Sequence, residues 1–453
     1  MNAINPATNE IVKNYIEHTS KEVDEKINAT HEAFLNWKDV SFKERSKLLK
    51  KTAKVLLQRK QELAELMALE MGKPLKQGIA EIEKCASVCE YYAENAAVFL
   101  QSEEVKTEAS KSYVTFNPIG VVLAVMPWNF PFWQVFRFLA PALMAGNTGV
   151  LKHASNVPGC AMAIDALIRE SGFPENVFQT LLIGSKEVDA VIEHQHIKAV
   201  TLTGSTQAGK KVAAKAGSLI KKTVLELGGS DAYIILEDAD LQKAVEICVA
   251  SRLINSGQSC ISAKRFIVVQ SIADKFIEQF KALMAAKKIG NPFETFTDIG
   301  PLARVDLRDE LHDQVKRSVA AGAKCLLGGE IPDQPGAYYP PTILINIKKG
   351  NPAYEEEFFG PVASIITAKD EQEAIFIAND NSFGLGAAVF TEDKIRAEQI
   401  ASELLEAGAC FVNSLVKSDP RLPFGGIKES GYGRELGLYG IKEFVNIKTV
   451  FIF

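Results

Sequence analysis

The segment Gly257-Gln258-Ser259-Cys260 follows a helical pattern and places one thiol directly after a run of small residues. A turn built from small residues can present that thiol to a cleft, where its thiolate form would act as a nucleophile. Most cysteines are simply buried, so this segment alone is weak evidence for catalysis. Other groups must accompany it.

Two further segments carry such groups. Glu226 ends a predicted strand before Gly228 and Gly229, and ligands of open α/β sheets bind at the carboxyl ends of strands. The alternative is a surface glutamate before a loop. Asn129 is the one amide in the apolar turn 127–131, where an unpaired amide would cost free energy. It is either a buried structural cap or a donor to a developing oxyanion.

The segment from Thr203 to Gly209 joins a strand to a helix and contains two glycines, Gly204 and Gly209. Their spacing differs from the GxGxxG of ordinary dinucleotide-binding enzymes. A glycine-rich turn at a helix N-terminus still offers amide donors to a phosphate. By itself this is weak evidence.

Alternating strands and helices must position these segments. A helical pattern runs from Lys21 to Phe99, with breaks at Gly72 and Pro74. Short βα units then follow in two series, which predicts parallel sheets with helices on their faces. The predicted strands are 112–117, 120–125, 149–152, 177–183, 199–203, 222–226, 232–236 and 265–270; the helices are 158–170, 188–194, 208–216, 241–256 and 272–286. The tail 444–453 alternates as an exposed strand does, and we expect it to pair with another subunit.

Composition excludes several classes. The net charge of −5 argues against a broad nucleic-acid-binding face. The apolar run 119–146 is interrupted by prolines and by Arg137, so we expect a buried turn and helix rather than a membrane span. The N-terminus has no basic-then-apolar signal pattern, and we expect a cytoplasmic protein. Seven cysteines argue against a disulfide framework, and His194 and His196 lack enough neighbouring ligands for a metal, so we expect none.

Together with Glu356-Glu357-Phe358-Phe359-Gly360-Pro361 and the segment 423–431, these motifs resemble the aldehyde dehydrogenase superfamily over essentially the whole chain. Within it, segments 224–231 and 263–266 are similar to those of the succinate-semialdehyde dehydrogenases, particularly a short bacterial branch. The resemblance implies an α/β fold with three parts. These are a Rossmann-like NAD(P)-binding domain (1–102 and 119–227), an α/β catalytic domain (228–430) and a β oligomerisation arm (103–118 and 431–453).

The resemblance also implies a mechanism. Cys260 attacks the aldehyde carbon, and the Asn129 amide and the Cys260 backbone N–H stabilise the oxyanion of the thiohemiacetal. Hydride transfer to the nicotinamide leaves a thioester, and Glu226 activates the water that hydrolyses it. Cofactor contacts are expected from Trp128, Lys152, Ser155, Gly204, Ser205, Gly209, Leu227, Glu357 and Phe359.

Ser155 bears on the choice of cofactor. NAD-preferring relatives usually carry a glutamate at this place, three residues after the lysine that matches Lys152. A carboxylate about 4 Å from a 2′-phosphate would cost roughly 4 kcal/mol per unit charge at a surface-like dielectric. Ser155 therefore favours NADP, with NAD as the alternative, although it also suits a helix cap.

Arg137 and Ser418 bear on the aldehyde. Arg137 lies between two phenylalanines, and a guanidinium in so apolar a setting needs an anion. That anion is either a structural carboxylate or, as the resemblance implies, the distal carboxylate of succinate semialdehyde, with Ser418 as a second contact. Two positions depart from the family. Ile254 stands where some members carry a second substrate arginine, and Ser262 stands where some carry a redox-active cysteine, so we predict no disulfide switch.

Other functions remain open. One is the NAD(P)-dependent oxidation of another small aldehyde. A second is a CoA-acylating semialdehyde dehydrogenase, against which Glu226 counts because that family generally lacks a base there. A third is a non-catalytic binding protein, which the retention of Cys260, Glu226 and Asn129 together argues against. The terminal strand and segment 112–117 predict an oligomerisation arm, hence a homodimer or a dimer of dimers.

Overall fold

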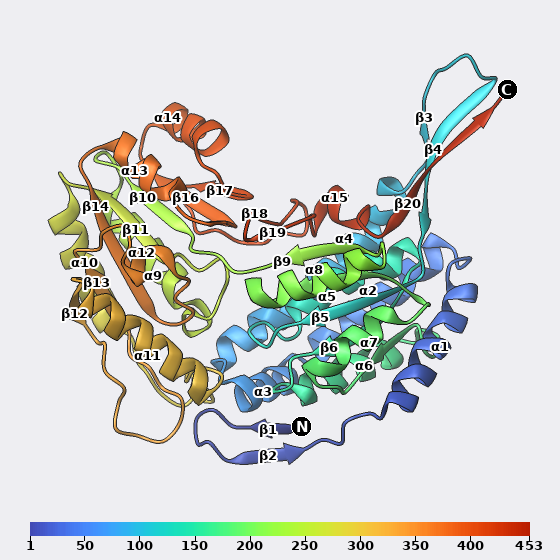
Figure 1. Ribbon diagram of the computed structural model, residues 1–453, viewed down its shortest axis with the longest axis horizontal. Coiled ribbons are helices and arrows are strands. Elements are labelled where there is room, and N and C mark those ends of the chain that lie inside the picture. Colours follow the sequence, from blue (N-terminus) through green and yellow to red (C-terminus); the bar gives the residue numbers. More distant parts are fainter.

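The structure, a computed structural model, describes all residues from Met1 to Phe453. It contains two α/β bodies side by side and a β arm that projects from the first body (Figure 1). A hairpin of two short strands, β1 (Asn2–Ile4) and β2 (Ile11–Asn14), precedes the first body. No helix combines the length and apolar character needed to cross a membrane.

The first body is built on a six-stranded sheet in the order β19-β9-β8-β5-β6-β7. All neighbouring pairs are parallel except β19 with β9. The strands are β5 (Val121–Met126), β6 (Thr148–His153), β7 (Phe178–Thr180), β8 (Ile197–Thr203), β9 (Lys222–Glu226) and β19 (Gly431–Tyr432). The run VVLAVM of β5 is apolar at every position because helices cover both faces of the sheet.

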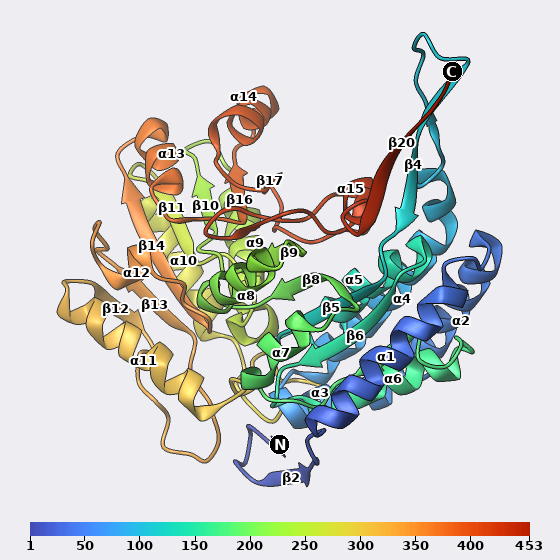
Figure 2. The ribbon, with the colours of Figure 1, turned by 45° about the vertical axis from the view of Figure 1, so that its right-hand side comes forward.

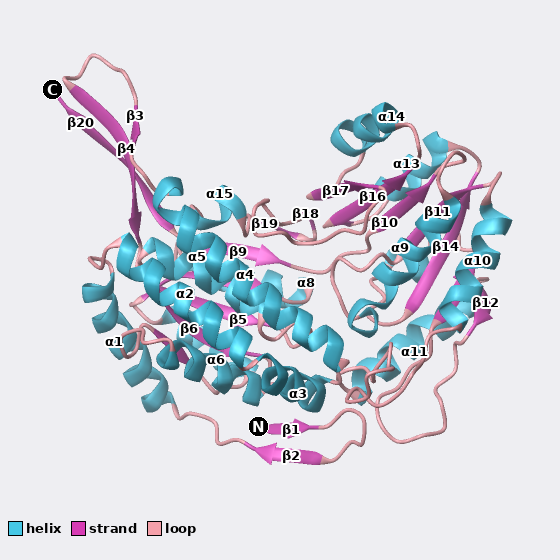
Figure 3. Cartoon of the chain, turned by 180° about the vertical axis from the view of Figure 1, so that it is seen from behind, coloured by secondary structure: helices cyan, strands magenta, loops and turns pink.

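Helices on the two faces separate the side chains of β5 into two cores. Val122 and Ala124 pack in one core with helices α2 to α6, whereas Val121 and Leu123 pack in the other with α1, α7 and α8. The helices are α1 (Ser20–Trp37), α2 (Phe42–Gln58), α3 (Lys60–Met71), α4 (Leu75–Phe99), α5 (Trp133–Ala145), α6 (Pro158–Glu170), α7 (Val188–Glu193) and α8 (Thr206–Ser218). Figure 3 shows α2, α4 and α5 on the side seen from behind.

The second body is built on a seven-stranded sheet in the order β12-β13-β14-β11-β10-β16-β17, parallel except for β12. Its strands are β10 (Ala232–Ile235), β11 (Arg265–Val269), β12 (Lys324–Leu327), β13 (Thr342–Ile345), β14 (Val362–Ala368), β16 (Gly386–Phe390) and β17 (Ala409–Val412). Its helices are α9 (Leu241–Leu253), α10 (Ala273–Ala285), α11 (Val305–Ala320), α12 (Pro352–Glu355), α13 (Glu371–Asn379) and α14 (Lys394–Gln399). A small pair, β15 (Phe383–Gly384) with β18 (Ile427–Lys428), lies beside this sheet's connection to the first body.

The arm is a three-stranded antiparallel sheet in the order β20-β4-β3, best seen in Figure 2. It consists of β3 (Glu103–Glu104), β4 (Lys111–Pro118) and β20 (Val445–Ile452). The predicted terminal strand is present as β20 and pairs with β4 of the same chain, which leaves β20 at the edge of the arm. Residues 431–441 differ from the arm to which we assigned them, because β19 joins the first sheet and α15 (Gly437–Ile441) contacts α4 and α5.

Candidate active site

The carboxyl ends of four adjacent strands bring the predicted residues to one edge of the first sheet. In the order β9-β8-β5-β6, Glu226 ends the first strand and Thr203 the second. The turn with Asn129 follows β5, and Lys152 lies near the end of β6. Parallel strands that run side by side end at the same edge, so residues far apart in sequence converge there.

A cavity of about 280 Å³ opens at this edge, between the two bodies. Eight residues that the sequence did not assign to the site complete its wall, among them Gln134, Leu307 and Gln314. The predicted residues that line it are Trp128, Asn129, Gly204, Ser205, Leu227, Cys260, Glu357 and Phe359. Trp128 and Phe359 meet edge to face, with ring centroids 5.7 Å apart. The cavity thus joins the predicted nucleophile to most of the predicted cofactor contacts.

The loop that carries Cys260 has an unusual backbone. Helix α9 ends at Leu253, and Asn255, Ser256 and Gly257 all have positive φ. A Cβ at Gly257 would lie 2.2 Å from the carbonyl oxygen of Gly360, so only glycine fits. The helix predicted to reach Ser256 is therefore too long. At this tight turn the loop of Cys260 packs closely against the segment 357–360, which carries Glu357 and Phe359.

Asn255 fastens this loop to the turn of Asn129. Its side-chain Nδ2 donates to the backbone oxygen of Asn129 at 2.7 Å and to that of Gln258 at 3.1 Å. The Nδ2 of Asn129 donates to the same Gln258 oxygen at 3.2 Å, while its Oδ1 is buried without a partner. The Asn129 amide therefore points at the loop of the nucleophile. Sequence reasoning missed the role of Asn255, for which its place on the helix before Cys260 was the only signal.

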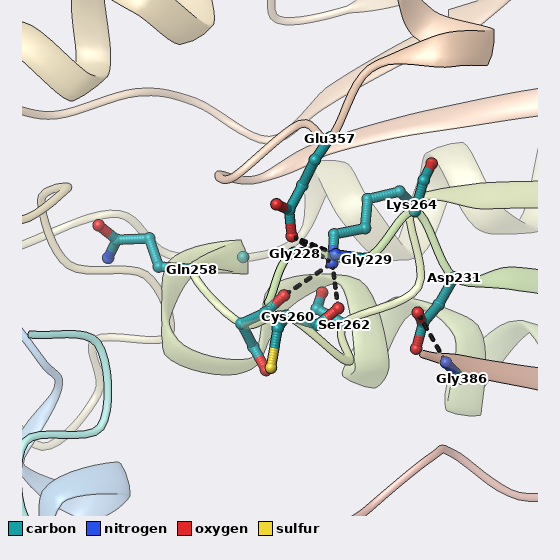
Figure 4. A network of polar contacts seen from close by, with 12 residues as sticks. Gly228, Gly229, Asp231, Gln258, Cys260, Ser262, Lys264, Glu357 and Gly386 are labelled. Carbon is teal, nitrogen blue, oxygen red and sulfur yellow. Dashed lines mark hydrogen bonds and ion pairs between the residues drawn. The ribbon is translucent and has the colours of Figure 1, made fainter. Parts of the chain in front are cut away.

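Cys260 is partly accessible, although protein surrounds its thiol. This burial raises the pKa of Cys260 to about 12, while the positive charges of Lys264 and Arg137 act in the opposite direction. Figure 4 shows the ammonium of Lys264 next to the backbone oxygen of Cys260. Lys264 also lies 3.3 Å from Glu357, whose carboxylate accepts the Gly229 backbone N–H at 3.0 Å. Glu357, expected at the cofactor ribose, thus lines the cavity while paired with Lys264.

Glu226 is buried, and neither of its carboxyl oxygens has a hydrogen-bond partner. Burial raises its pKa well above the usual value, and Arg137 opposes this shift. A Cβ at Gly425 would lie 2.8 Å from Oε1 of Glu226, so the absent side chain there leaves room for the carboxyl group. A carboxyl with a raised pKa and free oxygens is suited to accept a proton from water.

Arg137 has a partner within the protein. Its Nε forms an ion pair with Glu435, and both side chains are almost completely buried, at 2% and 5% exposure. Its Nη2 donates to Thr203 Oγ1 at 3.2 Å, and its guanidinium lies 4.9 Å from the centre of the Phe424 ring. We had two interpretations of the anion that Arg137 needs: a structural carboxylate or the carboxylate of the substrate. Glu435 is such a structural carboxylate.

Ser418 is buried and contacts side chains from α4 and α5. Its Oγ accepts hydrogen bonds from Lys84 Nζ at 2.8 Å and from Trp133 Nε1 at 3.1 Å. Lys84 escaped the sequence analysis because it is one lysine among many in the helical region 21–99.

The residues predicted for the adenosine end of a cofactor lie outside the cavity of Cys260. Ser155 lines a separate surface depression together with the cations Lys186 and Arg304. Lys152 is buried, and this burial lowers its pKa. Gly209 lies against Leu227, where a Cβ would approach to within 2.5 Å. Gly209 therefore sets the close packing of α8 and takes no part in the cavity wall.

These groups suit a phosphorylated nicotinamide cofactor. Ser205 caps α8 by accepting the Ala208 N–H at 3.3 Å, so a helix N-terminus faces the cavity with amide donors for phosphate. Position 155 itself carries no carboxylate. Two cations, Lys186 and Arg304, which a 2′-phosphate could pair with, line the depression together with the carboxylates Glu17, Glu187 and Asp306, of which Asp306 pairs with Arg304. The donor chemistry thus fits a pyrophosphate in the cavity and a further phosphate beside Ser155.

Comparisons with known proteins identify the family of the chain. The profile of the aldehyde dehydrogenase family matches residues 1–450. A Synechocystis protein named a probable succinate-semialdehyde dehydrogenase (NADP(+)) is 53% identical over 449 residues, which cover 99% of each chain. A Mycobacterium tuberculosis protein named a succinate-semialdehyde dehydrogenase (NADP(+)) is 49% identical over 452 residues, again 99% of each chain. A solved structure, succinic semialdehyde dehydrogenase from Streptococcus pyogenes in complex with NADP+, superimposes with a TM-score of 0.97 at 38% identity, covering 100% of this chain and 99% of that one.

Proposed function

Because the chain belongs to the aldehyde dehydrogenase family, we propose that it oxidises succinate semialdehyde to succinate with NADP as its cofactor. One observation carries the chemistry: Cys260 and Asn129 line the same cavity, at the sheet edge where Glu226 ends β9. The full-length relatives named for this aldehyde and this cofactor support the substrate and the cofactor.

The first step is the attack of the Cys260 thiolate on the aldehyde carbon, which forms the C–S bond of a thiohemiacetal. Since burial favours the neutral thiol, the thiol must first lose its proton, and the charges of Lys264 and Arg137 favour that loss. The Asn129 Nδ2 and the Cys260 backbone N–H then donate to the oxyanion. One such donor contributes about 3–4 kcal/mol in other enzymes.

The residues that would hold the cofactor form two groups. In the cavity, Trp128 and Ser205 would lie near its pyrophosphate, Phe359 near its nicotinamide and Glu357 at a ribose. Lys152, at the end of β6, and Ser155 would lie near its adenosine ribose. When bound, the cofactor supplies the acceptor for the hydride that leaves the tetrahedral carbon. The product on the protein is a thioester of Cys260.

Glu226 completes the cycle. Its carboxylate removes a proton from water, the hydroxide adds to the thioester carbonyl, and the C–S bond breaks to release succinate and the thiolate. The raised pKa makes Glu226 a stronger base once it is ionised. This base also distinguishes the proposal from a CoA-acylating enzyme, in which CoA would resolve the thioester.

A panel of aldehydes assayed with NAD and with NADP tests the proposal. We expect kcat/KM for succinate semialdehyde to exceed that for butanal at least tenfold, NADP to be preferred to NAD, and product to form without CoA. A preference for butanal would refute the substrate, equal use of the two cofactors would refute the NADP preference, and a requirement for CoA would refute hydrolysis by Glu226.

We also propose that the protein is a cytoplasmic homodimer or dimer of dimers. Strand β20 lies at the edge of the arm and exposes apolar side chains, including Ile447 at 60% and Phe451 at 48%. An exposed apolar edge strand favours contact with another copy. All seven cysteines are free thiols, which suits a reducing compartment. Light scattering of the purified protein tests the assembly; a monomer at micromolar concentration would refute it.

A further inference from the structure

The turn 127–131 carries Asn129 between β5 and α5, and side chains from three distant segments bind the backbone there. Asn255 donates to the backbone oxygen of Asn129 at 2.7 Å. His153 and Glu81 bind the backbone two to four residues later. Neither of these two residues lines the cavity of the nucleophile, so an effect on the reaction must pass through the turn.

Glu81 belongs to α4 and caps the start of α5. Its Oε1 accepts the backbone N–H groups of Phe132 and Trp133, at 2.9 Å each. The first N–H groups of a helix have no partner within the helix, so a carboxylate from another element can bind them. The other oxygen of Glu81 pairs with Lys73, and both side chains are almost completely buried. The Lys73 ammonium lies 3.8 Å from the centre of the ring of Phe130, which belongs to the turn.

His153 ends β6, the strand next to β5, and binds the turn that follows β5. Its Nδ1 accepts the backbone N–H of Ala154 at 2.8 Å, and its Nε2 lies 2.9 Å from the backbone oxygen of Pro131. A carbonyl oxygen can only accept, so Nε2 carries the hydrogen and donates it. Burial lowers the pKa of His153 to about 4, so the ring is neutral at pH 7 and supplies this one donor.

The place of the Asn129 amide therefore depends on groups outside the cavity. We infer that Glu81 and His153 are positioning residues for the oxyanion donor: they fix the turn 127–131 so that the Asn129 amide faces the carbon that Cys260 attacks. A displacement of about 1 Å in such a group can slow a reaction by about 100-fold. This inference rests on the proposed attack of Cys260 on the aldehyde.

Two reactions of the same thiol separate the position of the donor from the reactivity of Cys260. Attack on succinate semialdehyde creates an oxyanion, and stopped-flow absorbance follows the NADPH formed in the first turnover. Alkylation by iodoacetamide forms a C–S bond, expels iodide and creates no oxyanion. For His153→Leu, which lacks the donor, we expect the first turnover to slow about 10- to 100-fold and alkylation to stay unchanged. His153→Gln, whose amide can donate to the same oxygen, should restore most of the rate.

His196→Leu is the matched control. His196 is half-buried and stacks on His31, with ring centroids 3.7 Å apart. It directly precedes β8, so it lies at the amino edge of the first sheet, opposite to the turn that follows β5. Its replacement removes a histidine ring without touching the turn, and we expect neither reaction to change.

An unchanged first turnover in His153→Leu would overturn the inference, as would a slowing of alkylation by the same factor. If thermal unfolding shows that His153→Leu does not fold, two double variants replace it: Lys73→Met with Glu81→Leu, and Lys73→Met with Glu81→Gln. Both remove the buried charges, and only the second keeps an acceptor for the N–H groups of α5. A slower first turnover in the leucine pair supports the inference, and equal rates overturn it. Failure of the proposed function is a different result, since the unsubstituted protein would then form no NADPH from succinate semialdehyde.

Discussion

Arg137 and Glu435 form a buried ion pair at the carboxyl edge of the first sheet, although 297 positions separate them in the sequence. The same guanidinium opposes the burial-induced rise in the pKa of both Glu435 and Glu226. Arg137 thus favours the charged form of two neighbouring carboxyl groups, one of which is the proposed base.

Replacing Arg137 by Gln should leave Glu435 buried without a partner and lower the free energy of unfolding by about 3–5 kcal/mol at pH 8. Without Arg137 the pKa of Glu435 rises further, and a raised pKa favours the folded state only while the carboxyl is protonated. The loss should therefore be smaller at pH 5 than at pH 8. Urea denaturation at the two pH values measures it.

The double variant Arg137→Met with Glu435→Met is the control for this prediction. It removes both charges, so most of the lost stability should return. If Arg137→Gln is as stable as the unsubstituted protein and raises KM for succinate semialdehyde alone, Arg137 binds the substrate and the Glu435 pair is incidental.

The sequence predicted what depends on local pattern. Strand 222–226 and helix 158–170 agree with β9 and α6 to the residue, because apolar periodicity and a proline at the helix start mark them. Cys260, Asn129 and Glu226 lie at or shortly after the ends of such elements, and the structure brings them to the carboxyl edge of the first sheet. Their assembly there follows from the parallel order of the strands.

What the sequence left open depends on distant partners. The helix predicted over 241–256 ends early because Asn255 and Ser256 adopt left-handed backbone angles. Neither residue is a glycine or a proline, so the residue types at these two positions do not indicate the break. Glu435 lies outside the motifs identified in the sequence, the last of which ends at residue 431. Its pairing with Arg137 could therefore be found only from the folded structure. That Lys84 lacks a carboxylate partner becomes clear only from the fold, in which Glu81 pairs with Lys73 and Asp419 with Arg421.

Alkylation of Cys260 by iodoacetamide should be slow at pH 7 and increase about tenfold per pH unit up to pH 9. The pKa of about 12 leaves the thiol protonated throughout this range, and only the thiolate reacts. Peptide mass spectrometry separates Cys260 from the partly exposed Cys325 and Cys410. A rate that levels off below pH 9 would show that the thiol is ionised more easily than its burial implies.

Replacing Ser155 by Glu should reverse the choice of cofactor. The new carboxylate would face the 2′-phosphate and cost roughly 4 kcal/mol at about 4 Å, so kcat/KM with NADP should fall by two to three orders of magnitude. The value with NAD should stay the same or rise. Lys186→Ala, which removes a cation from the same depression, should weaken NADP alone and by less. Equal losses with both cofactors in Ser155→Glu would indicate a misfolded depression instead.

Replacing Glu226 by Gln should separate the two halves of the reaction. Attack by Cys260 and reduction of the cofactor do not require the base, so one equivalent of NADPH per active site should still form rapidly. Hydrolysis of the thioester should then slow by about 10²- to 10⁴-fold, the usual contribution of a general base. Stopped-flow absorbance at 340 nm shows the burst, and mass spectrometry of the quenched protein shows the acyl group on Cys260. Loss of the burst itself, in a variant that folds normally, would mean that Glu226 is needed to form the thiolate as well as to activate water.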